Sequence, residues 1–183
     1  MSQFIQTTAR PSGDMPRTLS KEVRRRQLIN ATITSIAKYG LPGTTTTTIT
    51  EIAGLSLGIV NLHFDSKRKL FNETLLFLAL EHQEMWKKGI EANGLSTEDK
   101  ILAIVDAHYH PKICSRKKLA VWFAFYGEAG NRPFYREITD EIDFGRIDTL
   151  ERLIGDLTAA SGIEHINAHD VTMPSKACST GCG

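Results

Sequence analysis

The sequence predicts an all-α fold, and three observations support this prediction. Apolar residues recur at helical spacing over long segments, as in residues 67–92. Ser, Thr or Asp residues precede these segments, and Gly or Pro residues follow them, as at helix ends. The threonine run at 44–48 has strand propensity, but we interpret it as the start of a helix because Thr45 suits an N-cap.

The first third of the chain predicts three helices, at 20–40, 45–53 and 56–62. Gly40 and Pro42 should end the first helix, Gly54 the second, and Ser56 should cap the third. Two short helices joined by Ala-Gly-Leu have the shape of a helix-turn-helix. We therefore expect a small helical module at 19–66, after a disordered leader at 1–18.

The rest of the chain predicts four longer helices, at 67–92, 97–110, 115–129 and 133–160. Asp65 and Ser66 should cap the first of these, and Ser96 with Asp99 resembles a capping box before the second. These helices predict a second domain at 67–160. Residues 161–183 show no apolar period, and we expect them to remain disordered.

Composition excludes several classes of protein. The chain has 183 residues, and its longest strictly apolar run, 119–126, is far shorter than the ~20 residues that cross a bilayer. The N-terminus lacks the apolar segment of a signal peptide, and three cysteines without a framework spacing fit a reducing compartment. We therefore expect a cytoplasmic protein.

Charge is distributed unevenly along the chain. Residues 1–72 hold ten Lys and Arg against four Asp and Glu, whereas the remaining residues hold twelve against seventeen. A basic N-terminal module joined to an acidic remainder indicates that the first module meets a polyanion.

Residues 45–71, TTTTITEIAGLSLGIVNLHFDSKRKLF, resemble the DNA-binding core of the TetR/AcrR family of bacterial transcriptional regulators. Nine positions fall on the family pattern without a gap: Thr45, Ile49, Ala53, Gly54, Ser56, Gly58, Phe64, Lys67 and Leu70. The resemblance implies an N-terminal helix-turn-helix DNA-binding domain and a C-terminal helical domain for ligand binding and dimerisation. It implies a repressor rather than an enzyme, with no cofactor and no metal.

The resemblance also implies which residues meet DNA. The second short helix should enter the major groove, where Asn61 reaches a base edge and Leu57 or Val60 a thymine methyl, while Ile59 faces the core. His63 replaces the family's tyrosine, so binding should weaken as pH rises. The expected DNA contacts are Arg24, Arg25, Thr45, Ser56, Leu57, Gly58, Val60, Asn61, His63 and Lys67.

Residues 24–40 and 118–137 look most like the choline-responsive repressors of glycine betaine synthesis genes within that family. This likeness implies a homodimer that leaves double-stranded operator DNA when a small-molecule inducer such as choline binds. Trp122, Phe125 and Tyr126 share one helical face and could form a cage for a quaternary ammonium, with Glu128 as charge partner. The alternative for this aromatic stripe is an ordinary core.

Other interpretations of the sequence remain open. The family continues into two further helices that form a dimer bundle, whereas this chain ends at Gly183, so we expect a truncated regulator with impaired dimerisation and non-specific DNA binding as one alternative. A small helical enzyme around His108, Tyr109 and His110 would need a nucleophile that the sequence does not offer. A metal site would have to use His165, His169, Cys178 and Cys182, whose spacing matches no common zinc pattern.

Overall fold

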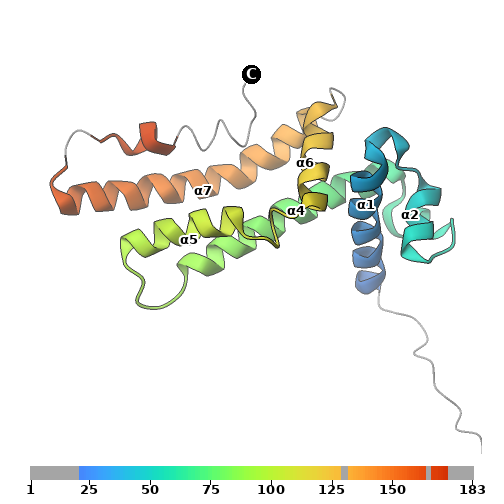
Figure 1. The fold of residues 1–183 in the computed structure, drawn as a ribbon, viewed down its shortest axis with the longest axis horizontal. Helices are drawn as coiled ribbons and strands as arrows, with labels where there is room; N and C mark the ends of the chain where they lie inside the picture. The colour runs from blue at the N-terminus through green and yellow to red at the C-terminus, as the bar shows by residue number, and fades with distance from the viewer. Residues whose placement is uncertain (1–20, 129–131, 164–165, 173–183) are drawn as a thin grey trace, which may run out of the picture.

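The computed structural model describes residues 21–128, 132–163 and 166–172, and these residues form helices without any strand, which confirms the all-α prediction. The predicted leader at 1–18 lies outside the described residues. The named helices are α1 (Lys21–Gly43), α2 (Thr46–Ala53), α3 (Ile59–Phe64), α4 (Lys67–Ile90), α5 (Thr97–Tyr109), α6 (Arg116–Gly127) and α7 (Arg132–Ser161) (Figure 1).

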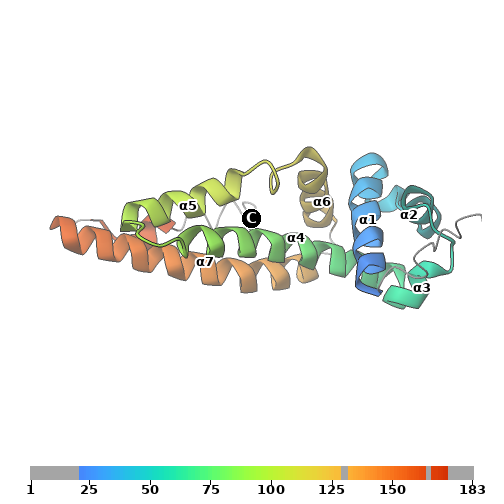
Figure 2. The same cartoon turned by 90° about the horizontal axis from the view of Figure 1, so that it is seen from below.

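The molecule is elongated, with a small head at one end. Helices α1, α2 and α3 form the head, while α4, α5 and α7 run side by side along the long axis (Figures 1 and 2). Helix α6 stands beside α1 at the junction and packs against it. Helix α4 starts under the head and continues into the three-helix body, so it belongs to both parts.

Local capping forms the helix ends of the head as the sequence predicts. The Thr45 hydroxyl accepts the Thr48 N–H at 3.1 Å, and the Thr48 hydroxyl accepts the Thr45 N–H at 3.0 Å, so the threonine run starts α2 with a capping box. Gly54 ends α2 in the left-handed region at φ 65°, which a residue without Cβ adopts at little cost. Gly40, at φ 70°, interrupts α1 as expected.

The third helix differs from its predicted position at 56–62. Helix α3 spans Ile59–Phe64, and its N-cap is Gly58, which offers no side-chain hydrogen bond. Ser56 accepts the Ile59 N–H at 3.1 Å through its carbonyl oxygen, so it forms the preceding turn rather than the cap. Burial sets this register: Val60 and Phe64, one helical turn apart, are 0% and 1% exposed.

The body follows the predicted boundaries closely. Ser66 alone caps α4, because Asp65 ends α3 at φ 61°. Ser96 and Asp99 form the expected capping box of α5. Helix α6 ends at Gly127, slightly before the predicted 129.

Part of the predicted disordered tail is folded, contrary to our expectation. Residues 168–172 are helical, and the Thr172 hydroxyl donates to Glu151 of α7 at 3.0 Å, so this short stretch packs on the body.

Two apolar clusters hold the described residues together. The larger cluster begins under α3 at Phe64, continues through Leu70 and Phe71 at the start of α4, and reaches Phe125 of α6 and Tyr135 of α7. The smaller cluster lies at the far end of the body and comprises Trp86, Ile104, Ala107, Leu150 and Leu153. Within the described residues, no helix is long and apolar enough to cross a bilayer.

Substitutions at the two glycines of the helix-turn-helix should have different effects on stability. Gly54→Ala should lower the free energy of unfolding by about 1 kcal/mol, because a Cβ is unfavourable at φ 65° although nothing lies within 4 Å of it. Gly58→Ala is the matched control: its φ is −69° and its Cβ also meets open space, so stability should change by less than about 0.5 kcal/mol. Urea denaturation of both variants checks the difference, and equal losses would contradict it.

Candidate nucleic-acid interface and ligand cavity

The outward face of α3 carries exposed side chains of mixed chemistry. Leu57 is 58% exposed and Leu62 is 72% exposed, and Asn61 is exposed beside them. An amide can form two hydrogen bonds with a base edge, and leucine methyl groups can contact a thymine methyl. The face therefore offers both kinds of contact that major-groove reading requires.

Val60 does not belong to this face, and its predicted contact with a thymine methyl is wrong. Its side chain is fully buried in the larger cluster, whereas Ile59 is only partly buried. Ile59 packs against the same cluster, as the sequence predicts, although it is only partly buried. Leu62 of α3, which the sequence did not single out, is exposed.

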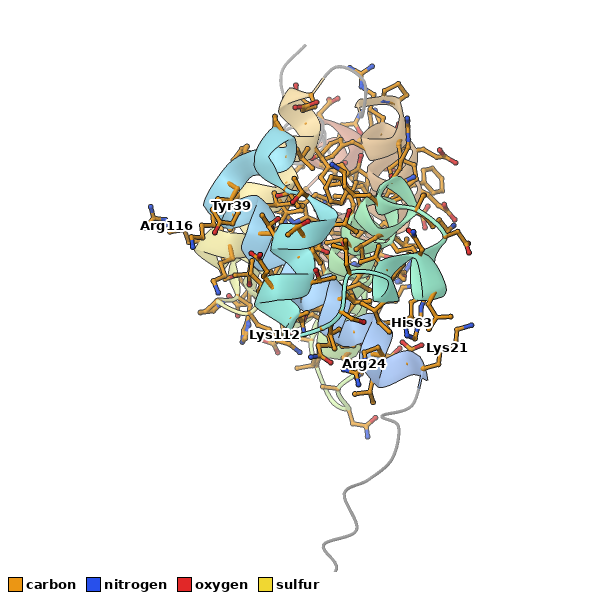
Figure 3. The ribbon with its side chains drawn as sticks, turned by 90° about the vertical axis from the view of Figure 1, so that its right-hand side faces the viewer. Lys21, Arg24, Tyr39, His63, Lys112 and Arg116 are labelled. Carbon is orange, nitrogen blue, oxygen red and sulfur yellow. The ribbon has the colours of Figure 1, made fainter. Side chains whose placement is uncertain are left out.

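A cationic edge flanks α3. Figure 3 shows Lys21 and Arg24 of α1 near His63, at one side of the head. Burial lowers the pKa of His63 below 6.5, and the positive charges of Lys21, Arg25 and Arg24 lower it further. His63 is therefore mostly neutral near pH 7 in the free protein, and a DNA phosphate beside it would raise its pKa.

Arg25 is engaged within the protein. Its guanidinium donates to the carbonyl oxygen of His63 and to the carboxylate of Glu73, and it lies 4.2 Å from the centre of the Phe64 ring. It thus joins α1, α3 and α4, with 21% of its side chain exposed. This geometry assigns Arg25 a structural role in the free protein, whereas Arg24 donates to its helical neighbour Gln27, at 2.7 Å.

Thr45 and Lys67 lie at the ends of α2 and α4 that face outward. Thr45 is exposed, and its hydroxyl already serves the capping box. The Lys67 ammonium donates to the carbonyl oxygen of Thr44 at 2.9 Å, and an ammonium has three donors, so a phosphate oxygen could share it. Ser56, Gly58 and Lys67 are exposed near α3 as the sequence predicted.

A cavity of about 230 Å³ lies in the body, between α4, α5, α6 and α7. Trp122 and Tyr126 line it, and Tyr135 of α7 completes an aromatic wall. The ring centres of Trp122 and Tyr135 are 5.9 Å apart and those of Tyr126 and Tyr135 are 5.6 Å apart, edge to face. The remaining lining residues are Ala79, His82, His108, Ile113, Cys114, Leu119, Phe123, Thr139, Ile142 and Asp143.

Two members of the predicted cage lie elsewhere. Phe125 is 1% exposed and packs against Phe71 of α4, with ring centres 6.3 Å apart, so it belongs to the core. Glu128 is exposed beyond the end of α6 and lines a separate depression with Lys67 and other residues at the start of α4. Helical spacing on α6 alone does not predict this wall, because the wall also contains a residue of α7.

The opposite end of the cavity is polar. The rings of His82 and His108 lie 5.2 Å apart, next to Asp143, which accepts a hydrogen bond at 3.1 Å from Arg146. Arg146 is 4% exposed. Burial lowers the pKa of His82 to about 4, and burial lowers the pKa of His108 as well. Both imidazoles are therefore neutral at pH 7.

The structure also describes some of the residues that the sequence offered as candidates for a metal site or for catalysis. Of the four residues considered for a metal site, only His169 lies within the described residues, and its Nδ1 lies 2.7 Å from a Glu151 oxygen. Tyr109 is 72% exposed at the end of α5, while His108 turns inward to the cavity. The sequence singled out His108, but no sequence pattern indicated that His82 and Asp143 would line the same cavity.

Comparison with known proteins agrees with this geometry. Residues 28–74, from the middle of α1 to α4, match the family model for bacterial regulatory proteins of the tetR family. The chain is also 30% identical over 124 residues to the HTH-type transcriptional regulator BetI of Paraburkholderia xenovorans, and 30% identical over 127 residues to that of Burkholderia lata. The N-terminal head of this chain belongs to the TetR family.

The match to both BetI proteins covers 68% of this chain and 64% of each relative, so the chain spans less than two thirds of the length of these relatives. These TetR-family relatives are transcriptional regulators and not enzymes.

Solved structures show the same fold. A candidate transcriptional regulator from Pseudomonas aeruginosa PAO1 superposes with a TM-score of 0.73 at 23% identity, over 89% of this chain and 78% of that one. A TetR-like transcriptional regulator from Rhodococcus sp. RHA1 gives a TM-score of 0.68 at 18% identity, over 89% and 83%. The fatty acid degradation regulator FadR from Bacillus halodurans gives 0.65 at 15% identity, over 86% and 80%.

The two arginines predict separable effects. Arg25→Ala should lower the free energy of unfolding by about 2 kcal/mol, because it removes charge-assisted bonds and leaves Glu73 without this partner. Arg24→Ala is the matched control and should change stability by less than about 0.5 kcal/mol. Thermal and urea denaturation measure both. A larger loss for the Arg24 variant would contradict the structural role of Arg25.

The buried imidazole of His82 predicts a loss of stability in acid. Its pKa is about 4 in the folded chain and 6.5 for an unperturbed histidine side chain, so the unfolded chain binds more protons between these values. The contribution is fully present above pH 6.5 and falls by roughly 3 kcal/mol as pH drops through 4. His82→Gln should flatten this part of the stability curve, measured by urea denaturation from pH 7.5 to 4. An unchanged slope in the variant would contradict the assignment.

Proposed function

We propose that the chain is a transcriptional repressor that binds operator DNA through α3 and releases it when a small molecule enters the cavity of the body. The observation that carries this proposal is the outward face of α3 and of the turn before it, where Leu57, Asn61 and Leu62 are exposed. Lys21 and Arg24 lie near His63 at the end of the same helix (Figure 3). The head thus offers groups for base reading and groups for phosphate binding close together.

In the proposed complex, α3 enters the major groove. Asn61 pairs with a base edge, and Leu57 or Leu62 contacts a thymine methyl. Thr45, His63 and Lys67 bind phosphates on either side, and Arg24 adds a further backbone contact. Because one short helix reads few base pairs, we propose a homodimer whose two heads meet half-sites about one helical turn apart.

Helices α4 and α6 connect the cavity to the head. Helix α4 continues from the cavity wall to the turn after α3, and α6 packs on α1. Phe125 of α6 contacts Phe71 at the start of α4, while its neighbour Tyr126 contacts Tyr135 in the cavity wall. A ligand that prefers one arrangement of these rings would shift the heads away from the spacing that DNA requires.

The inducer that we propose is a small quaternary ammonium compound such as choline, with choline and glycine betaine genes as the regulated set. The likeness to BetI supports this choice, and so does the aromatic wall of Trp122, Tyr126 and Tyr135, since ring faces attract a quaternary ammonium. Asp143 lines this cavity, whereas Glu128 lies outside it. Because its target is the bacterial chromosome, we propose a cytoplasmic location.

The proposal is tested by fluorescence anisotropy of the full chain on DNA from upstream of its own gene, with scrambled DNA as control, at about 150 mM salt. Native DNA should bind roughly 1,000-fold more tightly than scrambled DNA, and choline should release it. Equal, weak binding to both DNAs would contradict a sequence-specific repressor and favour the alternative of a regulator with impaired dimerisation.

Asn61→Ala should weaken binding to native DNA by roughly 1–3 kcal/mol and leave binding to scrambled DNA nearly unchanged, because only base reading is removed. Asn93→Ala, in the exposed connection between α4 and α5, is the matched control and should bind both DNAs as the parent chain does. The same anisotropy titration measures all three proteins. An equal loss on both DNAs in the Asn61 variant would refute base reading by this residue.

A further inference from the structure

Two imidazole nitrogens at the polar end of the cavity lack a hydrogen-bond partner. His82 Nε2 and His108 Nδ1 are buried and have no such partner among the described residues, and both side chains line the cavity. Unpaired buried polar atoms are costly, so this end of the cavity is suited to a ligand that forms hydrogen bonds with the two imidazoles. A neutral imidazole can place its N–H on either ring nitrogen, so both rings can donate to a ligand that supplies acceptors.

The charges at this end also favour an anion. Asp143 carries the acidic charge beside the imidazoles, and Arg146 holds it in an ion pair at 3.1 Å. Arg146 lowers the pKa of both His82 and His108 more strongly than Asp143 raises it, so the potential at the two rings is net positive. A negative group placed beside the two rings would therefore be stabilised.

We infer that the imidazoles of His82 and His108 bind the carboxylate of a small-molecule ligand whose other end lies against Trp122, Tyr126 and Tyr135. In this arrangement each imidazole donates one N–H to the carboxylate, and a compact apolar or quaternary ammonium group fills the aromatic end. The inference rests on the proposed function, because it names the chemical class of the ligand for the same cavity.

The size of the cavity limits the ligand. A volume of about 230 Å³ is below the ~300–1,000 Å³ of typical pockets for drug-sized ligands. A ligand with one carboxylate and a head of three methyl groups suits this volume. Choline would fill the aromatic end but would offer a hydroxyl, rather than an anion, to the two imidazoles.

Four compounds of nearly equal shape separate the two ends. Glycine betaine and choline share a trimethylammonium head, and 3,3-dimethylbutyrate and 3,3-dimethylbutan-1-ol carry the matching uncharged tert-butyl head. The first compound of each pair has a carboxylate and the second a hydroxyl. Titration calorimetry of the full chain at pH 7 should give at least about tenfold tighter binding for the carboxylate in each pair, since charge-assisted hydrogen bonds are the stronger ones.

The variants His82→Gln and His108→Gln should each reduce this preference to less than about threefold. His169→Gln, whose ring contacts Glu151 outside the cavity, is the matched control and should retain it. Either cavity variant that misfolds is replaced by His82→Asn or His108→Asn, after circular dichroism has shown a native helix content. Retention of the full preference in folded variants at both positions would overturn the assignment to these imidazoles.

Equal binding of carboxylate and hydroxyl compounds, or no binding of either carboxylate, would also overturn the inference. Its failure is distinguishable from failure of the proposed function. Tighter binding of the ammonium head than of the tert-butyl head tests the aromatic wall, and the DNA titration tests the repressor, neither of which depends on the imidazoles.

Discussion

Burial of the apolar face of α4 is the constraint on which the rest of the structure depends. Leu70 and Leu75, near its start, are fully buried in the cluster that supports α1 and α3, and Trp86, near its end, is buried against α5 and α7. One rigid helix therefore supports both the head and the body. A substitution that shifted α4 would alter α3 and the cavity together, because α4 contributes residues to both apolar clusters.

Arg25 connects α1, α3 and α4 through polar contacts, in addition to the apolar packing of α4. Its guanidinium contacts the carbonyl oxygen of His63 and the carboxylate of Glu73, and stacks on Phe64, so the short helix α3 is held at both its core and its C-terminal end. A helix of six residues has little stability by itself. The orientation of α3 therefore depends on its neighbours, and mainly on α1 and α4.

The cavity combines two chemistries that a single helix could not provide. Its aromatic end comes from α6 and α7, and its imidazole end from α4 and α5. Opposite properties at the two ends favour a ligand with two different ends in one orientation, and the small volume excludes large ligands. Helices α4 and α6 line the cavity and also contact the head, α4 through α1 and α3 and α6 through α1.

The sequence by itself determined the features that depend on interactions between residues close together in the chain. Thr45, Gly54 and Ser96 act within a few residues, so the helix ends that they define, the all-α fold and the family pattern could be predicted. Only the tertiary structure decided that Val60 is fully buried while its neighbour Ile59 is partly buried, because both pack on helices distant in sequence. It also decided that Arg25 meets partners 38 and 48 residues away, and that Tyr135 rather than Phe125 completes the aromatic wall. Contacts of this kind depend on how whole helices pack, and helical spacing within one segment does not contain that information.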